Sequence, residues 1–197
     1  MSVRPSVLFP LLILLALAGC AGVSPRSDFH VLSPVVESGA PPPAVLRLGV
    51  GPVRLPDYLD RNQMVRLRDE TSIEVDEFNR WGGDLARNIQ DVLAENLSRL
   101  LGSQEVVTHP WSSTLALPLQ LVIDIRRFDL DAASQVVLDL QWRLIRNDGR
   151  QPPVIRNEHI VVPAGDGSPA AQVKAMNQAL AELARRIAAV LSSRQDG

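Results

Sequence analysis

Histidine, serine and acidic side chains are the residues of this chain that could carry catalysis or bind a metal, and their spacing favours neither. The three histidines, His30, His109 and His159, lie in separate segments and share no metal-ligand spacing. No serine lies in the G-x-S-x-G turn that exposes an acyl-transfer nucleophile. The acidic residues between positions 57 and 76 lack the central glycine of an EF-hand loop, which favours a solvated surface. We therefore expect no enzyme, no metal site and no cofactor.

Cys20 is the one cysteine of the chain, and its surroundings predict a specific modification. Arg4 and the apolar run Val7–Leu17 precede it, as in a secretory signal. Leu17-Ala18-Gly19-Cys20 resembles the bacterial lipobox, in which the cysteine sulfur is acylated and the cysteine becomes the new N-terminus. The run is shorter than the ~20 residues of a membrane-spanning helix, so we interpret residues 1–19 as a cleaved signal peptide. A plain signal peptide with an incidental cysteine is the alternative.

The remaining chain has the length and composition of one anchored domain. Residues 20–28 are small and polar and are expected to be a tether, followed by a single domain over residues 29–197. Ala21, rather than Asp, follows the cysteine, which by resemblance to sorting in enteric bacteria favours the periplasmic face of the outer membrane. A net charge of −2 gives no basic surface for nucleic acid. The 46% hydrophobic content supports a core without disulfides.

The hydrophobic pattern predicts an α+β fold. Apolar stripes predict two long helices: one over residues 85–100, capped by Asp84 and Gly102, and one from Ser168 to Val190. We expect a two-layer sandwich, with both helices on one face of a largely antiparallel sheet. On the second strand, Gly49 and Gly51 share one face and leave a flat surface for close packing. Strands are predicted over residues 29–32, 45–53, 63–68, 73–75, 105–108, 119–126, 135–144 and 156–162.

Tyr58 and Trp81 are large aromatic residues in segments rich in glycine or proline, in a chain with only 4% aromatic residues. Such side chains often anchor protein interfaces. The alternative is that each one closes an end of the core. Trp142 alternates with Leu140 and Leu144 and is expected in the core.

Residues 48–61 carry the most specific pattern of the chain. A G-V-G-P-V strand is followed by L-P-x-Y-L-D-R, and Arg80-Trp81 then precedes the first long helix. In this order the chain resembles the PqiC-like (YmbA-type) ABC-type transport auxiliary lipoproteins. Residues 29–34 resemble the opening aromatic strand of that family, although His30 replaces the second aromatic residue. Asn62 stands where the family often has proline.

The resemblance implies a non-enzymatic role in lipid transport. Members of the family work with a periplasmic MCE-domain protein and an ABC permease and ATPase, which move phospholipids or other lipids between the inner and outer membranes. The lipoprotein is expected to dock the MCE assembly, and a homo-oligomeric ring would match a ring-shaped partner. The residues expected to bind the partner are Tyr58, Leu59, Asp60, Arg61, Arg80 and Trp81.

A second hypothesis is a lipoprotein that itself binds a lipid or a small apolar ligand. That function requires a cavity between the sheet and the helices. An enzyme is the third hypothesis, and it requires a compact cluster of polar side chains.

Overall fold

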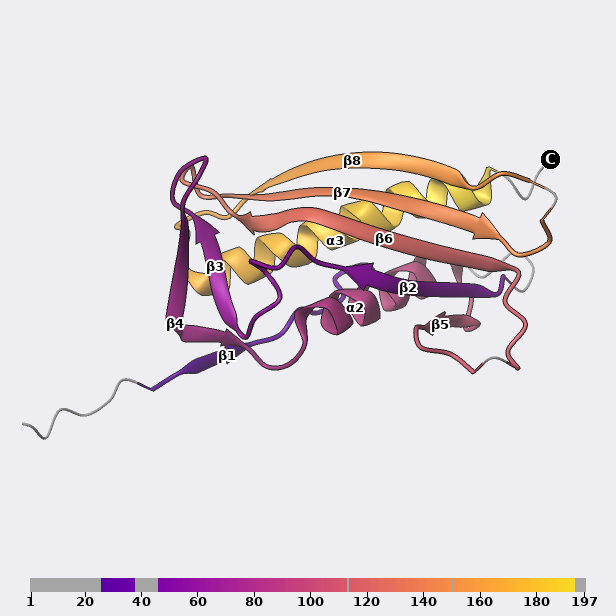
Figure 1. Cartoon of the computed structure of the whole chain (residues 1–197), viewed down its shortest axis with the longest axis horizontal. Coiled ribbons are helices and arrows are strands. Elements are labelled where there is room, and N and C mark those ends of the chain that lie inside the picture. The colour runs from indigo at the N-terminus through magenta and orange to yellow at the C-terminus, as the bar shows by residue number, and fades with distance from the viewer. Residues whose placement is uncertain (1–25, 38–45, 113, 150, 194–197) are drawn as a thin grey trace, which may run out of the picture.

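The computed structural model describes residues 26–37, 46–112, 114–149 and 151–193 (Figure 1). The signal peptide, the acylation of Cys20 and most of the tether, all expected from the sequence, fall outside these residues. In the described chain, no helix is both long enough and apolar enough to cross a membrane.

The described residues form eight strands in one sheet and two helices. Every predicted strand and both predicted helices are present, with ends that differ by up to six residues, the most at the end of β4. The helices are α2 (Leu85–Leu101) and α3 (Pro169–Ser192). The strands are β1 (Asp28–His30), β2 (Leu48–Arg54), β3 (Gln63–Leu67), β4 (Ile73–Trp81), β5 (Val106–Thr108), β6 (Leu119–Leu130), β7 (Gln135–Arg146) and β8 (Val154–Pro163).

Strand β6 is the centre of the sheet. It pairs with β7 along one side, and on the other side with β2 near its start and with β3 at its end. Strands β5 and β8 lie at two outer edges, and β1 lies beyond β4. In Figure 1, β3 and β4 run steeply across one end of β6–β8, so the sheet curls.

The expected two-layer sandwich on a largely antiparallel sheet is therefore correct only in its broad α+β class. The β6–β7, β7–β8 and β3–β4 pairs are antiparallel, whereas β2 runs parallel to both β5 and β6. The pairs β1–β4 and β3–β6 are also parallel. For the β2–β5 pair, the reason is the helical connection between β4 and β5. Helix α2 carries the chain back along the sheet, so that β5 enters parallel to β2.

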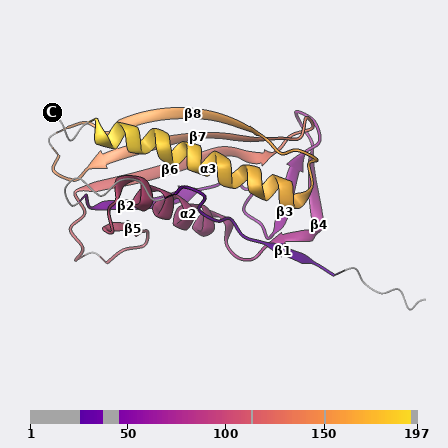
Figure 2. The same ribbon diagram turned by 180° about the vertical axis from the view of Figure 1, so that it is seen from behind.

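Both helices pack on one face of the sheet, as predicted (Figure 2). Ile89, Leu93 and Leu97 of α2 are fully buried, and α3 buries a stripe that includes Leu180 and Ile187. Trp142 is the largest fully buried side chain, and its place in the core agrees with the alternation. The helix ends also form as expected. The Asp84 carboxylate accepts a hydrogen bond from the Arg87 N–H, the Ser168 hydroxyl accepts one from the Ala171 N–H, and Gly102 ends α2 with φ +60°.

Residues 31–37 form an extended segment, here called the strap, which crosses the helical layer in front of α2 in Figure 2. Its side chains Leu32 and Val36 are buried, and helix asparagines accept hydrogen bonds from its backbone. These contacts satisfy backbone donors that would otherwise be lost on burial. The strap donors and their acceptors are Leu32 N to Asn88 Oδ1 (2.7 Å), Ser33 N to Asn177 Oδ1 (3.0 Å) and Val36 N to Asn96 Oδ1 (3.3 Å).

The glycine face of β2 is covered by the chain that follows β5. A Cβ atom on Gly49 would lie 2.9 Å from the Trp111 ring and 2.8 Å from Leu117 Cδ1. At Gly51, whose φ is +115°, the Gln90 side chain occupies the corresponding space and donates a hydrogen bond to the His109 carbonyl (2.6 Å). The close packing predicted from these two glycines is therefore present.

We expect Gly49→Ala to lower the free energy of unfolding by about 1–3 kcal/mol, because the added methyl group would overpack the contact with Trp111 and Leu117. Urea unfolding measures the change. Gly83→Ala is the matched control, since a Cβ atom there meets no atom within 4 Å. Equal stability of the two variants would contradict the assignment.

Candidate functional site

The three segments that carry the most specific sequence pattern meet at one end of the sheet. Strand β1 runs beside β4, so that Phe29 lies opposite Arg80 and His30 opposite Trp81. The loop after β2, residues 55–62, reaches the same place, where the Trp81 N–H donates a hydrogen bond to the Asn62 carbonyl (2.6 Å). We call the surface formed by β1, the end of β4 and this loop the β1–β4 end. The predicted partner-binding residues are thus neighbours in space, although about 20 residues separate their two segments.

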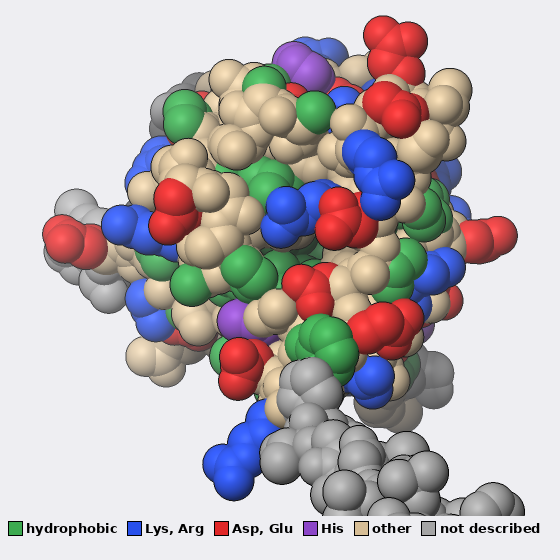
Figure 3. Space-filling model, turned by 90° about the vertical axis from the view of Figure 1, so that its left-hand side faces the viewer, with side chains coloured by type: hydrophobic (Ala, Val, Ile, Leu, Met, Phe, Trp, Pro, Cys, Tyr) green, Lys and Arg blue, Asp and Glu red, His purple; other side chains and the backbone are tan. Residues whose placement is uncertain are grey.

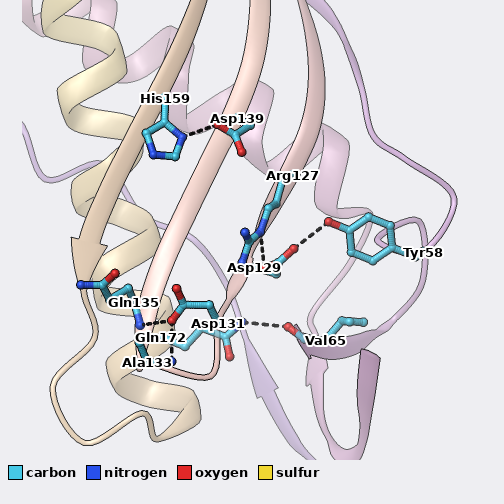
Figure 4. A network of polar contacts seen from close by, with 10 residues as sticks. All are labelled: Tyr58, Val65, Arg127, Asp129, Asp131, Ala133, Gln135, Asp139, His159 and Gln172. Atoms are coloured by element: carbon cyan, nitrogen blue, oxygen red, sulfur yellow. Dashed lines mark hydrogen bonds and ion pairs between the residues drawn. The ribbon is translucent and has the colours of Figure 1, made fainter. Parts of the chain in front are cut away.

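A buried carboxylate holds the loop in place (Figure 4). Asp129 of β6 is fully buried. The Tyr58 hydroxyl donates to Asp129 Oδ2 at 2.6 Å, and Arg127 Nε donates to Asp129 Oδ1 at 3.0 Å. The Tyr58 ring packs against the core. This side chain therefore joins the loop to the centre of the sheet by one strong hydrogen bond and by apolar contact.

The electrostatics of this trio follow from burial. Burial raises the pKa of the Asp129 carboxyl, and the donors Tyr58 and Arg127 only partly oppose that effect. The pKa of Tyr58 is raised well above its usual value, first by burial and then by the hydrogen bond to Asp129. Tyr58 therefore stays a neutral donor at physiological pH.

The other predicted site residues divide between core and surface. Leu59 and Trp81 are buried in the core. Asp60 and Arg61 are exposed. Arg80 is half-buried, and its Nε donates to the Glu77 carbonyl at 3.0 Å. The accessible charged groups of the predicted set are thus those of Asp60, Arg61 and Arg80.

Asp129 and Arg127 are the residues of this arrangement that sequence reasoning missed. The alternating pattern predicted a strand that ends at residue 126, before both residues. Instead, β6 continues to Leu130 and buries the carboxylate. The only signal in the sequence is a tyrosine in a loop that needs a partner for its hydroxyl, and nothing in one sequence identifies that partner.

The histidines stay apart in the folded chain. His30 contacts Asn79, His159 contacts Asp139, and His109 packs against the edge of Trp111. Within the described ranges, no group of three or more His, Cys, Asp or Glu side chains is placed to hold a metal ion.

Two hollows of the described surface have the volume of a small-molecule site. One, of about 500 Å³, lies between the β3–β4 and β6–β7 turns and is lined by Leu67, Arg127 and acidic side chains that include Asp69. The other, of about 680 Å³, lies between α2, β5 and the segment that holds Trp111. Both linings mix charged and apolar groups, whereas lipid pockets are mostly apolar.

Comparison with known proteins gives a family and a fold. The family model for the ABC-type transport auxiliary lipoprotein component matches residues 30–188. The crystal structure of an uncharacterized protein is 21% identical, with a TM-score of 0.67 over 85% of this chain and 99% of that one. Protein XCC0632 from Xanthomonas campestris is 18% identical, with a TM-score of 0.67 over 86% of this chain and 98% of that one. Both have a similar fold. No curated protein matches the chain.

We expect Tyr58→Phe to lower the free energy of unfolding by about 1–3 kcal/mol, because Asp129 would keep its burial and lose one of its two donors. Chemical denaturation measures the loss. The control is the same substitution in an Asp129→Leu background, where no buried acceptor remains and the cost should nearly vanish. An equal loss in both backgrounds would contradict the role given to the hydrogen bond.

The pKa of Asp129 predicts a pH dependence of stability. Its folded-state pKa is raised, so the unfolded chain ionises first as pH increases. The free energy of unfolding of the native protein, minus that of Asp129→Asn, should therefore fall as pH rises from about 4. It should level off above the folded-state pKa. Urea unfolding of both proteins from pH 3.5 to pH 7 tests this. A difference that stays constant or rises with pH would refute the predicted sign.

Proposed function

The chain belongs to the family of ABC-type transport auxiliary lipoprotein components, and we propose that it is the docking component of an MCE/ABC-type system for intermembrane lipid transport. Its role is non-enzymatic: it holds an MCE-domain protein, and through it an ABC permease and ATPase, at the periplasmic face of the outer membrane. The match of the family model over residues 30–188 is the observation that carries this proposal.

Anchoring is the first part of the proposed function. The lipobox residues Leu17 to Cys20 place an acylated cysteine eight residues before β1. Eight residues span at most about 29 Å, so the domain stays within one domain diameter of the bilayer. Ala21 favours the outer membrane over retention in the inner membrane.

Docking at the β1–β4 end is the second part. The segment Tyr58–Arg61 and the pair Arg80-Trp81 lie together there. We assign two tasks to these residues according to their burial. Tyr58, Leu59 and Trp81 fix the loop against the core, and the exposed Asp60 and Arg61, with the half-buried Arg80, contact the partner. Charged rim residues of this kind mainly set the rate and the specificity of association.

The oligomeric form of the proposed component follows from its partner. A lipoprotein that docks a ring-shaped MCE assembly meets the same surface repeated around an axis. A ring of lipoproteins with the same symmetry would satisfy every copy of that surface equally.

We expect Cys20→Ala to move the protein from the membrane fraction to the soluble periplasmic fraction, because the acyl chains supply the attachment. Cell fractionation and the mass of the N-terminal peptide measure this, with the unmodified precursor mass as the reference. An acylated native protein that stays soluble, or an Ala variant that stays on the membrane, would contradict the anchor.

We expect Arg61→Glu to weaken capture of the MCE-domain protein by about tenfold, equivalent to about 1.4 kcal/mol, because it reverses an exposed charge in the proposed docking surface. Co-purification at low salt, followed by titration with the purified partner, measures the effect. Arg156→Glu is the control, since it makes the same charge change at an exposed position of β8. Equal capture by both variants would rule out docking at the β1–β4 end. It would not bear on the family or on the lipid anchor.

A further inference from the structure

The β1–β4 end carries an apolar patch that neither the core nor the proposed docking contacts explain. Phe29 is 68% exposed, Val31 59% and Phe78 46%. A Phe side chain exposed to this degree at the surface of a folded domain leaves a large apolar area in water. In Figure 3, which faces this end, apolar side chains reach the surface beside the point where the described chain begins.

The β1–β4 ladder brings the three residues to one end of the sheet. Phe29 is opposite Arg80, and Phe78 precedes Arg80 by two residues on the same strand. Val31 follows Phe29 by two residues and packs over Gly82, where an added Cβ atom would lie 3.0 Å from Val31 Cγ1. We call Phe29, Val31 and Phe78 the apolar patch. It lies at and beside β1, an edge strand that pairs with β4 alone among the described strands.

We propose that the apolar patch rests on the bilayer next to the lipid anchor, with its side chains in the interface between headgroups and acyl chains. This inference relies on the acylated Cys20 of the proposed function. Phe29 follows Cys20 by nine residues, so the chain cannot carry the patch more than about 32 Å from the lipid-bearing sulfur. Within that distance the bilayer is present at all times, whereas any protein partner must first arrive.

The surroundings of the patch also fit a lipid surface. Charged groups lie beside it: Arg80 is opposite Phe29 in the β1–β4 ladder, and its side chain forms an ion pair with Glu77 at 3.6 Å. Aromatic and apolar side chains flanked by charged groups are the usual composition of interfacial segments. An extended strand of three residues is short enough to lie along the interface without burying unpaired backbone groups in the acyl region.

Site-directed spin labelling of the full-length lipidated protein in phosphatidylethanolamine–phosphatidylglycerol vesicles tests this inference. Cys20 is the only native cysteine and is acylated in that protein, so single cysteines at Phe29→Cys, Val31→Cys or Phe78→Cys carry the label alone. The ratio of collisions with oxygen to collisions with a water-soluble nickel complex should be severalfold higher at these sites than at Ile155→Cys. Ile155, 49% exposed on β8, is the matched control.

A second variant separates the patch from the anchor. Phe29→Asp combined with Phe78→Asp should lower the oxygen-to-nickel collision ratio at a Val31→Cys label until it equals the ratio at Ile155→Cys. The protein should still float with the vesicles. Equal ratios at Phe29→Cys and Ile155→Cys in the otherwise native protein would overturn the proposal. Protection of the patch from the nickel complex would also overturn the proposal if it appears without lipid and rises with protein concentration. The same holds if the protection appears only after addition of the MCE-domain protein. Flotation and the acylated peptide mass report the anchor in the same samples, so a failed patch and a failed anchor give different results.

Discussion

The buried carboxylate of Asp129 is the constraint on which the β1–β4 end depends. A carboxylate that is fully removed from water destabilises a fold unless donors meet it, and here the donors are Tyr58 and Arg127. Tyr58 belongs to a loop that could otherwise adopt many conformations. Its hydrogen bond to β6 selects one of them and, through Asn62 and Trp81, sets the start of β3 and the end of β4. One side chain thus determines where the exposed groups of Asp60 and Arg61 stand.

The sequence predicted the elements of the fold far better than their arrangement. Alternation of apolar residues in β6 and β7, and the caps Asp84 and Ser168, are local signals, so strands and helices could be placed from them. The pairing of β2 with β5 and β6 is not local. It depends on how α2 returns the chain along the sheet, and the same alternating pattern is compatible with a parallel or an antiparallel neighbour. The expectation of a largely antiparallel sheet missed the parallel pairs for this reason.

The candidate site was predictable as segments and not as contacts. Residues 55–61 and Arg80-Trp81 stood out in the sequence by their types and spacing, and the fold brings them together. Their division into buried and exposed groups depends on tertiary packing, which places Trp81 in the core and Arg61 at the surface. Asn88, Asn96 and Asn177 illustrate the same limit, because as single polar residues in helices they gave no sign that they bind the strap.

The proposed contact of Phe29, Val31 and Phe78 with the bilayer changes what an acyl anchor can do. A flexible tether fixes the distance of a domain from the membrane but leaves its orientation free, and a partner that binds one orientation must then offset the lost rotational freedom. Three apolar side chains beside the tether would fix that orientation before the partner arrives. The same β1–β4 ladder would then connect both surfaces, because Phe29 lies opposite Arg80 and Arg80 pairs with Gln63, which directly follows the loop of residues 55–62. A rigid link of this kind lets the domain present Asp60 and Arg61 at a constant height and direction above the lipid, which a tether alone cannot provide.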